Sequence, residues 1–258
     1  MKINRIKKGF SRWTIIIIII ILLSIFYFSF ETEESYQESV KIRSIENDGF
    51  CVLYNPQYSI QTITRPCSQL EKDALSRLPE GYEFIDYIYK INNVALSTFH
   101  RDVTSSKHNY NTKYPVYTLI LYKYDGELLS VCPRSNATYP FVWSNIVNIH
   151  GKSGTAFLFD CDLLHAGRIN NCQDREVIQY KIAHRGDMPK LAHLHGIRNE
   201  KTDICKLSYY NMIMRKLSYY FEMPINYIFY PIMIKRENAD TILGKIQSYI
   251  PITYYNNA

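Results

Sequence analysis

The sequence has almost no surplus of charge outside its first thirteen residues. Its 258 residues include 30 Lys and Arg against 24 Asp and Glu, a formal net charge of +6. Five basic residues and no acidic residue precede Trp13, namely Lys2, Arg5, Lys7, Lys8 and Arg12. The rest of the chain therefore has 25 basic residues (30 − 5) against 24 acidic ones. A nucleic-acid-binding domain needs a basic patch on its folded part, so we expect no nucleic-acid partner.

Missing motifs exclude a protein kinase. The stretch "HRD" at residues 100–102 is how a kinase catalytic loop begins, but that loop needs an asparagine five residues after the aspartate. This chain has Lys107 at that position. It also lacks a GxGxxG loop, a VAIK-like lysine and a downstream DFG motif. The "HRD" stretch therefore needs another explanation.

Long apolar runs are missing too, except for one near the N-terminus. Residues 13–30 contain no charged side chain and are just long enough to cross a bilayer as a helix. The basic residues before this run, with Glu31, Glu33 and Glu34 after it, place the N-terminus in the cytoplasm. We predict a basic cytoplasmic tail at residues 1–12 and a single transmembrane signal-anchor at residues 13–30.

A cleaved signal peptide is the competing interpretation of this run. Its apolar region would usually span about 7–15 residues and end in a small-x-small site, which "FSFETEE" does not offer. The anchor is therefore favoured, and residues after Phe30 are expected in a lumen or outside the cell, beginning with a polar stalk at residues 31–44. Disulfides are permitted there among the six cysteines, as are buried free thiols. Asn136 in "NAT" is the single candidate for N-glycosylation.

The remaining sequence predicts a mainly β fold. Seven short segments rich in β-branched and aromatic residues run from residue 82 to residue 184. No ten-residue helical pattern separates them, which argues against parallel βαβ units. We therefore predict a double-stranded β-helix, or jelly roll, over residues 45–185.

Helices are expected on either side of these strands. One precedes them at residues 68–78, with Ser68 and Glu71 as a capping box. A C-terminal extension at residues 186–258 contains two further helical patterns, at residues 205–223 and 238–250. We expect this extension to pack on the barrel as flanking helices.

Three residues are candidates for a metal site. On a strand, His100 and Asp102 point to one face while Arg101 points to the other. An imidazole and a carboxylate on one face can take two adjacent coordination positions, and a facial iron site needs one more ligand. His165, just after the predicted strand "GTAFLFD", supplies it. Asp160 and Asp162 are expected to shape the turn before His165 rather than to bind the metal.

The stretch "FHRD", followed by "LLHAG" and Arg175, resembles the Fe(II)/2-oxoglutarate-dependent dioxygenases, and most nearly their phytanoyl-CoA and prolyl hydroxylase branches. The resemblance spans about residues 45–184. It implies that His100, Asp102 and His165 hold Fe(II). It also implies a membrane-anchored hydroxylase that couples decarboxylation of 2-oxoglutarate to hydroxylation of a protein side chain, a lipid or a glycan, with ascorbate allowed as a reductant.

The same resemblance assigns the co-substrate contacts. Arg175 would pair with the distal carboxylate of 2-oxoglutarate, and Tyr117 or Tyr122 would donate a hydroxyl to it. Two alternatives stay open at this point. Arg175 could instead pair with a neighbouring acidic residue while Arg168 or Lys90 takes its role. The whole domain could also be a catalytically inactive jelly roll that acts as a binding or structural membrane protein.

Overall fold

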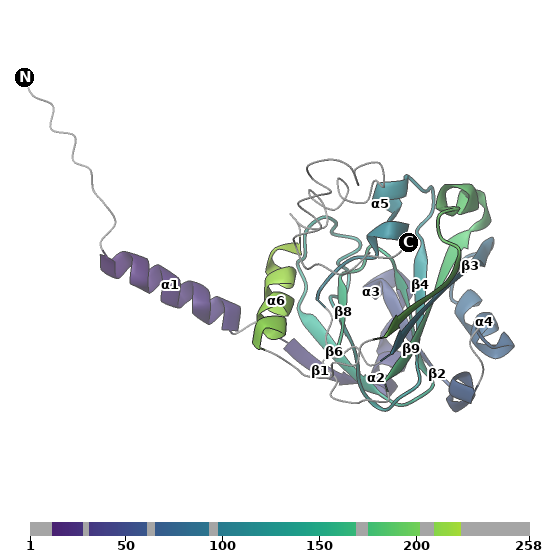
Figure 1. Ribbon diagram of the computed structural model, residues 1–258, viewed down its shortest axis with the longest axis horizontal. Coiled ribbons are helices and arrows are strands. Elements are labelled where there is room, and N and C mark those ends of the chain that lie inside the picture. The colour runs from purple at the N-terminus through teal and green to yellow at the C-terminus, as the bar shows by residue number, and fades with distance from the viewer. Residues whose placement is uncertain are drawn as a thin grey trace, which may run out of the picture. The chain divides into compact units, whose positions relative to one another are not determined.

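The computed structural model of the chain (Figure 1) describes residues 12–27, 31–60, 65–92, 98–168, 175–201 and 209–222. The chain divides into two compact units, residues 1–31 and 32–258. The described part of the first unit contains helix α1 (Arg12–Tyr27), which has 16 residues. Among the described residues, no helix is both long and apolar enough to cross a membrane. Residues 28–30 of the predicted anchor lie outside those ranges.

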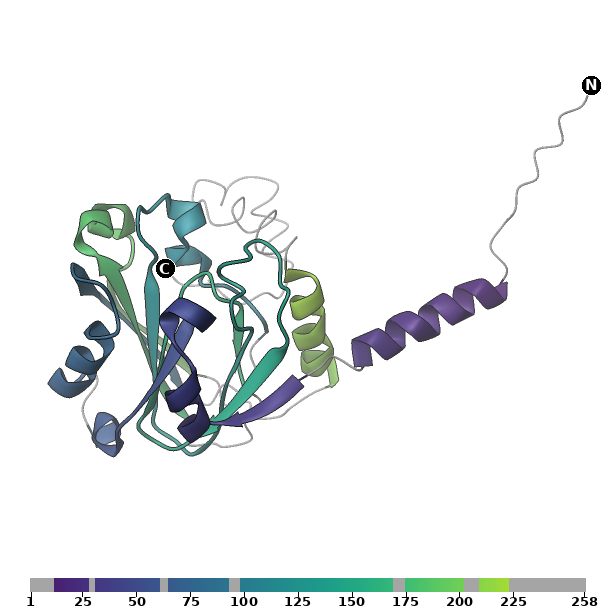
Figure 2. The ribbon, with the colours of Figure 1, turned by 180° about the vertical axis from the view of Figure 1, so that it is seen from behind.

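The second unit contains two sheets. The larger has the strand order β10–β3–β9–β4–β7–β2 and the smaller has the order β1–β6–β5–β8. The strands of the larger sheet are β2 (Phe50–Tyr54), β3 (Tyr82–Asn92), β4 (Tyr117–Tyr122), β7 (Thr155–Asp160), β9 (Glu176–His184) and β10 (Gly196–Lys201). Those of the smaller sheet are β1 (Glu31–Ser35), β5 (Gly126–Val131), β6 (Ile146–Gly151) and β8 (His165–Gly167). Two views of the ribbon show the sheets facing each other (Figures 1 and 2). The predicted mainly β fold is confirmed, and it is consistent with a jelly roll.

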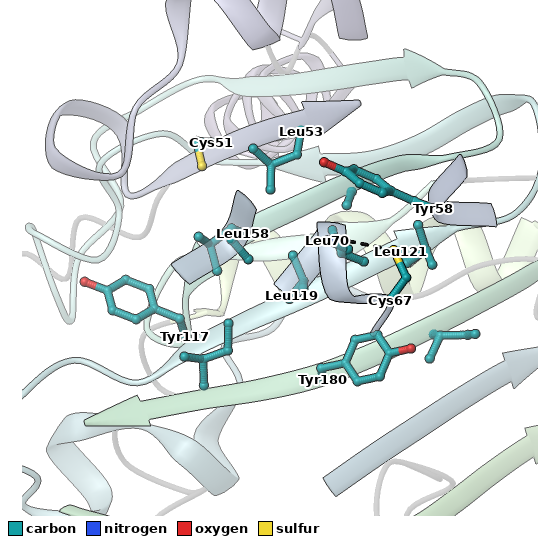
Figure 3. Close-up of a cluster of buried hydrophobic side chains, with 14 of the residues drawn as sticks. Cys51, Leu53, Tyr58, Cys67, Leu70, Tyr117, Leu119, Leu121, Leu158 and Tyr180 are labelled. Atoms are coloured by element: carbon teal, nitrogen blue, oxygen red, sulfur yellow. Dashed lines mark hydrogen bonds between the residues drawn. The ribbon is translucent and has the colours of Figure 1, made fainter. Parts of the chain in front are cut away.

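The core forms two layers, one on each face of the larger sheet. Ile120 and Tyr122 of β4 pack between the two sheets, against apolar residues of β5, β7 and β9. Because side chains alternate along a strand, Leu119 and Leu121 point to the opposite face. There they pack with Leu70 of helix α4 (Ser68–Leu75), as Figure 3 shows. The helix predicted on the outer face of the barrel is therefore present.

The start of α4 differs from the prediction. The capping box of Ser68 and Glu71 is wrong, because the N-cap is Cys67, whose Sγ accepts the N–H of Leu70 at 3.3 Å. Cys67 is buried in the outer cluster beneath the helix, which brings its side chain to the first turn. The helix ends at Leu75 rather than at residue 78. The short 3₁₀ helix η1 (Pro56–Ile60) precedes it in the chain.

The segment predicted as a polar stalk is folded. Strand β1 is hydrogen-bonded beside β6, and it leads into helices α2 (Tyr36–Ile42) and α3 (Ile45–Asp48). Ser35 and Glu38 form a capping box at the start of α2. Arg43 then bonds Glu34 at 2.6 Å. Hydrogen bonds and ion pairs, rather than buried apolar side chains, hold this edge strand and the helix cap that follows it. The segment therefore lacks the apolar periodicity by which strands and helices are predicted from sequence.

In the described residues of the C-terminal extension, one of the two predicted helices is present together with a strand that was not predicted. The extension contains the 3₁₀ helix η3 (Arg185–Leu191), strand β10 and helix α6 (Tyr209–Tyr220). Strand β10 adds a parallel edge to β3, with Gly196 opposite Tyr87, so the larger sheet extends beyond the predicted domain end at residue 185. Helix α6 falls within the first predicted helical pattern. The second pattern, at residues 238–250, lies outside the described residues.

Candidate metal centre

A backbone bridge brings the first and third predicted ligands together. The N–H of His100 donates to the carbonyl of His165 at 2.9 Å, and the N–H of His165 donates back at 3.0 Å. Two residues on, the N–H of Asp102 donates to the carbonyl of Cys161 at 2.8 Å. The predicted strand at residues 93–102 is thus reduced, in its described part, to a short stretch beside β8. That stretch is followed by η2 (Val103–Ser105) and α5 (Lys107–Tyr110).

The three side chains converge as predicted. Oδ1 of Asp102 lies 3.9 Å from Nε2 of His100 and 3.8 Å from Nε2 of His165. One ligand atom from each residue lies within 4.8 Å of the others. The side chains of Asp102 and His165 are 8% and 3% exposed, whereas that of His100 is 25% exposed. The cluster is therefore buried on two sides and open near His100.

Both imidazoles are oriented by backbone carbonyls. Nδ1 of His100 lies 2.8 Å from the carbonyl oxygen of Thr98, and Nδ1 of His165 lies 3.0 Å from that of Leu163. A carbonyl can only accept, so each Nδ1 carries the proton and each Nε2 presents a lone pair toward Asp102. This arrangement is how metal-binding histidines are usually fixed.

The second oxygen of Asp102 is held by the larger sheet. Oδ2 accepts hydrogen bonds from Thr118 at 2.5 Å, from Lys181 at 2.7 Å and from Gln179 at 3.3 Å. The Lys181 side chain is 2% exposed, so this is a buried ion pair. Sequence reasoning missed Lys181. The alternation of "REVIQYKIAH" could have found it, because Gln179 and Lys181 share one face of that strand.

The charges at the site follow from burial and from this pair. Burial lowers the pKa of both His100 and His165, and His165 falls to about 4 with a further contribution from its neighbour His100. Burial alone would raise the pKa of Asp102, but the charge of Lys181 and the two histidines outweigh it and hold that pKa low. At neutral pH the cluster consists of a carboxylate and two neutral imidazoles, which is the protonation state that a metal requires.

These donors fit a divalent metal. With bonds of about 2.1 Å, neighbouring ligand atoms around a metal lie about 3 Å apart. The two separations from Asp102, 3.8 Å and 3.9 Å, exceed that by less than 1 Å, and all three ligand atoms lie within 4.8 Å of one another, so the side chains would move closer together around a bound metal. Two imidazoles and one carboxylate match the facial set of non-haem Fe(II) sites, which leaves the remaining positions open.

The predicted co-substrate residues separate onto two faces. Tyr117 lies in the outer cluster beneath α4, as Figure 3 shows, and so on the opposite face of β4 from Asp102's partner Thr118. Tyr122 lies inside, and its pKa is raised by burial and lowered in part by the charge of Arg175. Cζ of Arg175 lies 5.9 Å from the ring centroid of Tyr124. Tyr122 rather than Tyr117 therefore shares a side with Arg175.

Arg175 immediately precedes β9, in the same alternation as Gln179 and Lys181, which hold Asp102. It precedes Gln179 by four positions, about 13 Å along a strand. The alternative cation Arg168 is engaged elsewhere, since its Nη2 lies 3.0 Å from Glu127 on the smaller sheet. Lys90 lies on β3 opposite Ile178, a residue of the outer cluster. Of the three cations weighed from the sequence, Arg175 is the best placed.

The turn before His165 is shaped by its two aspartates, as predicted. Asp160 Oδ1 accepts the N–H of Asp162 at 2.9 Å. The carboxylate of Asp162 accepts bonds from the Ser106 hydroxyl and, at 3.2 Å, from the N–H of Lys107. Asp160 therefore closes the turn, and Asp162 connects it to the start of α5.

The candidate modification sites are engaged within the fold. Nδ2 of Asn136 donates to Asp160 at 3.1 Å, so a glycan attached to that nitrogen would replace this bond. Cys51, Cys67 and Cys161 are buried free thiols. Cys172 and Cys205 lie outside the described residues.

No family model matches the chain, and no curated protein matches it. Solved structures do match. EvdMO1 has a TM-score of 0.41 and 12% identity over 58% of this chain, which spans 50% of that protein. The non-heme alpha ketoglutarate dependent epimerase SnoN from nogalamycin biosynthesis has a TM-score of 0.38 and 10% identity over 58% of this chain and 82% of that one. EvdO2 from Micromonospora carbonacea var. aurantiaca, complexed with 2-oxoglutarate, has a TM-score of 0.39 and 10% identity over 59% of this chain and 94% of that one. Likeness at this level supports no functional argument, so the function must be inferred from the side chains.

Proposed function

We propose that this chain is an Fe(II)- and 2-oxoglutarate-dependent dioxygenase that hydroxylates a protein side chain, a lipid or a glycan. The observation that carries the proposal is the orientation of the donors. Two imidazoles have their Nδ1 atoms bonded to carbonyls, and their Nε2 atoms face one oxygen of a buried carboxylate. A coincidental cluster would not need both rings to be fixed in the same tautomer.

His100, Asp102 and His165 would hold the metal, and iron bound there would supply the activation of dioxygen. The protein contributes a site in which Asp102 and His165 are buried and both imidazoles are oriented by backbone carbonyls. Asp102 is limited to one metal-facing oxygen, because its other oxygen is occupied by Thr118, Gln179 and Lys181. A carboxylate that binds through one oxygen leaves more positions open for co-substrate and oxygen.

Arg175 and Tyr122 are proposed to bind the distal carboxylate of 2-oxoglutarate. A guanidinium stays charged when it is buried, and its planar fork matches a carboxylate. Arg175 is 4% exposed, immediately precedes β9, and has its Cζ 5.9 Å from the ring centroid of Tyr124. The tyrosine hydroxyl at residue 122 would add a neutral donor from the neighbouring strand. Thus the two strands that hold Asp102 would also hold the co-substrate.

The test is anaerobic Fe(II) binding, followed by measurement of succinate release in air with 2-oxoglutarate. The wild-type chain should bind about one Fe(II) and release succinate, increasingly so with an acceptable substrate. Asp102→Ala and His165→Ala should lose both properties, since two protein ligands rarely hold Fe(II) against water. His195→Ala, at an exposed histidine, is the matched control and should retain both.

A catalytically inactive domain is the second candidate, and one observation favours it. Lys181 already neutralises Asp102, so the cluster is electrostatically satisfied without a metal. Such a domain would keep the fold and bind a partner through its loops. It would bind no Fe(II) in the same titration, or would bind Fe(II) without releasing succinate.

Anchoring in a membrane is also a proposal. It is supported by the uncharged run at residues 13–30 and by the basic residues before it. The catalytic unit would then face a lumen or the cell exterior. A C-terminal tag should be protected from protease in intact microsomes and digested after detergent is added. Digestion in intact microsomes would reject this orientation.

A further inference from the structure

Helix α6 lies against the two chain segments that carry the metal ligands. Both ribbon views show it beside β8 (Figures 1 and 2). The hydroxyl of Ser218 accepts the N–H of Phe99 at 2.8 Å, one residue before His100. Nη1 of Arg215 donates to the carbonyl of Gly167 at 2.6 Å, two residues after His165. The helix thus contacts both segments close to their ligands.

A third contact lies between two of the ligands. Arg101 separates His100 from Asp102 in sequence, and it points away from them as the strand pattern predicts. Its side chain is 1% exposed, and its guanidinium forms an ion pair with Glu222, just past the end of α6. The same guanidinium donates to the carbonyls of Ser135 and Asp162. Removing Glu222 would leave a buried cation without its carboxylate.

The segment at residues 98–102 needs such support because it is weakly paired. Both backbone groups of His100, its N–H and its carbonyl, are hydrogen-bonded to His165. The N–H of the preceding residue, Phe99, therefore points to the other edge of this stretch, where no described strand lies. An edge N–H that is buried without a partner destabilises the fold. Ser218 satisfies it, and also donates its own proton to the carbonyl of Arg215 at 2.7 Å.

The orientation of α6 shows that these contacts decide how it packs. A surface helix normally turns its apolar side chains to the core. Here Arg215, Ser218 and Glu222 are buried, while Tyr209 is 89% exposed and Ile213 is 50% exposed. Among the side chains of α6 that the structure describes, Tyr219 also contacts this region, with its ring centroid 5.4 Å from that of Phe99. The described polar side chains of the helix therefore tie it to the ligand-bearing segments.

We propose that Ser218 and Glu222 are positioning residues for the metal centre, and that α6 sets the separation of its ligands. The inference rests on the proposed function, because it assumes that the triad binds a divalent metal. Ser218 fixes the backbone before His100, Glu222 fixes Arg101 between His100 and Asp102, and Arg215 fixes the strand after His165. None of them touches the metal. Outer contacts of this kind typically change metal affinity by about 10- to 100-fold.

Anaerobic titration of the full chain with Co(II), followed by visible absorption, tests this without any measurement of turnover. Ser218→Ala should bind Co(II) about 10- to 100-fold more weakly, with shifted absorption bands. Ser218→Thr keeps the hydroxyl and should restore both the affinity and the bands. Ile213→Ala, on the exposed side of the same helix, is the matched control and should behave as the wild type. Glu222→Gln provides a second variant should Ser218→Ala fail to fold.

The outcomes separate the two proposals. No Co(II) binding by the wild-type chain would reject the metal centre and the role of α6 together. Wild-type binding, with unchanged affinity and bands in both Ser218→Ala and Glu222→Gln, would reject the role of α6 alone. A loss of thermal stability in these variants with an unchanged Co(II) spectrum would also reject it, since that result means that the helix only stabilises the fold.

Discussion

Nζ of Lys181 lies 2.7 Å from Oδ2 of Asp102, while Oδ1 of the same carboxylate faces both imidazoles. The two oxygens of Asp102 thus have different partners. In the metal-free chain, Lys181 neutralises the charge of the Asp102 carboxylate. A metal bound at Oδ1 would add a second positive charge beside this carboxylate without displacing Lys181 from Oδ2.

Replacing Lys181 by Met should therefore destabilise the metal-free chain and increase its response to metal. Breaking a buried pair from one side costs about 3–5 kcal/mol, because the remaining charge is uncompensated. A metal ion would compensate Asp102 in the variant, so the rise in melting temperature on adding Co(II) should exceed that of the wild type. Lys190→Met, at a lysine whose side chain is 45% exposed, is the control. A metal-free Lys181→Met variant as stable as the wild type would contradict the importance of the pair.

The two tyrosines of β4 provide a matched test of the co-substrate site. Tyr122→Phe removes one hydroxyl from the inner side and should raise the KM for 2-oxoglutarate about 2- to 10-fold, the value of one neutral hydrogen bond. Tyr117→Phe removes the same group from the outer side and should leave that KM unchanged. Steady-state succinate release measures both. Equal effects in the two variants would argue against the placement of 2-oxoglutarate beside Tyr122.

Arg175→Ala should lose most turnover, and Arg175→Lys should lose part of it. A lysine keeps the charge but not the planar fork that binds a carboxylate through two hydrogen bonds. The expected rise in the KM for 2-oxoglutarate is about 10- to 100-fold in the alanine variant. Fe(II) binding should be retained, and excess 2-oxoglutarate should restore turnover. Arg168→Lys serves as the control. An unchanged KM in Arg175→Ala would remove Arg175 from the site.

The metal-free chain should lose stability as the pH falls from about 6.5 to about 4. Burial, with the charge of His100, lowers the pKa of His165 from 6.5 to about 4. Between these values the unfolded chain binds more protons than the folded chain, so lowering the pH favours unfolding. Urea denaturation at several pH values measures the slope. His165→Gln should flatten it over this window, whereas His195→Gln should not. Equal slopes in all three proteins would show that His165 does not contribute.

The convergence of His100 and Asp102 could be predicted from sequence because strand alternation is a strong local rule. His100 and Asp102 are two residues apart, and Arg101 between them does point away, although the described part of the expected strand, residues 98–102, pairs only through a single bridge. The same rule did not decide between Tyr117 and Tyr122. Their choice depends on which face of β4 meets the second sheet, and this is a tertiary relationship.

Other features had no local signal. Strand β1 is short and acidic, and it becomes a strand because the edge of β6 accepts it. Strand β10 pairs with β3 across more than a hundred residues. Helix α6 shows a helical pattern, but among its described side chains the polar Arg215 and Ser218 are buried while Ile213 is exposed, so apolarity alone does not locate its buried face. In each case the partner segment, rather than the segment's own composition, decides the structure.

The pairing of His100 with His165 makes chain length in the preceding turn a determinant of chemistry. The carbonyl of Cys161 accepts the N–H of Asp102, and the backbone of His165 pairs with that of His100. Both ends of residues 161–165 are therefore attached to the same stretch, residues 100–102. One residue inserted or deleted between Cys161 and His165 would bring a neighbour of His165 opposite His100 and turn the imidazole of His165 to the other face. Relatives that share the chemistry should therefore align through this turn without a gap, however far the rest of their sequences has diverged.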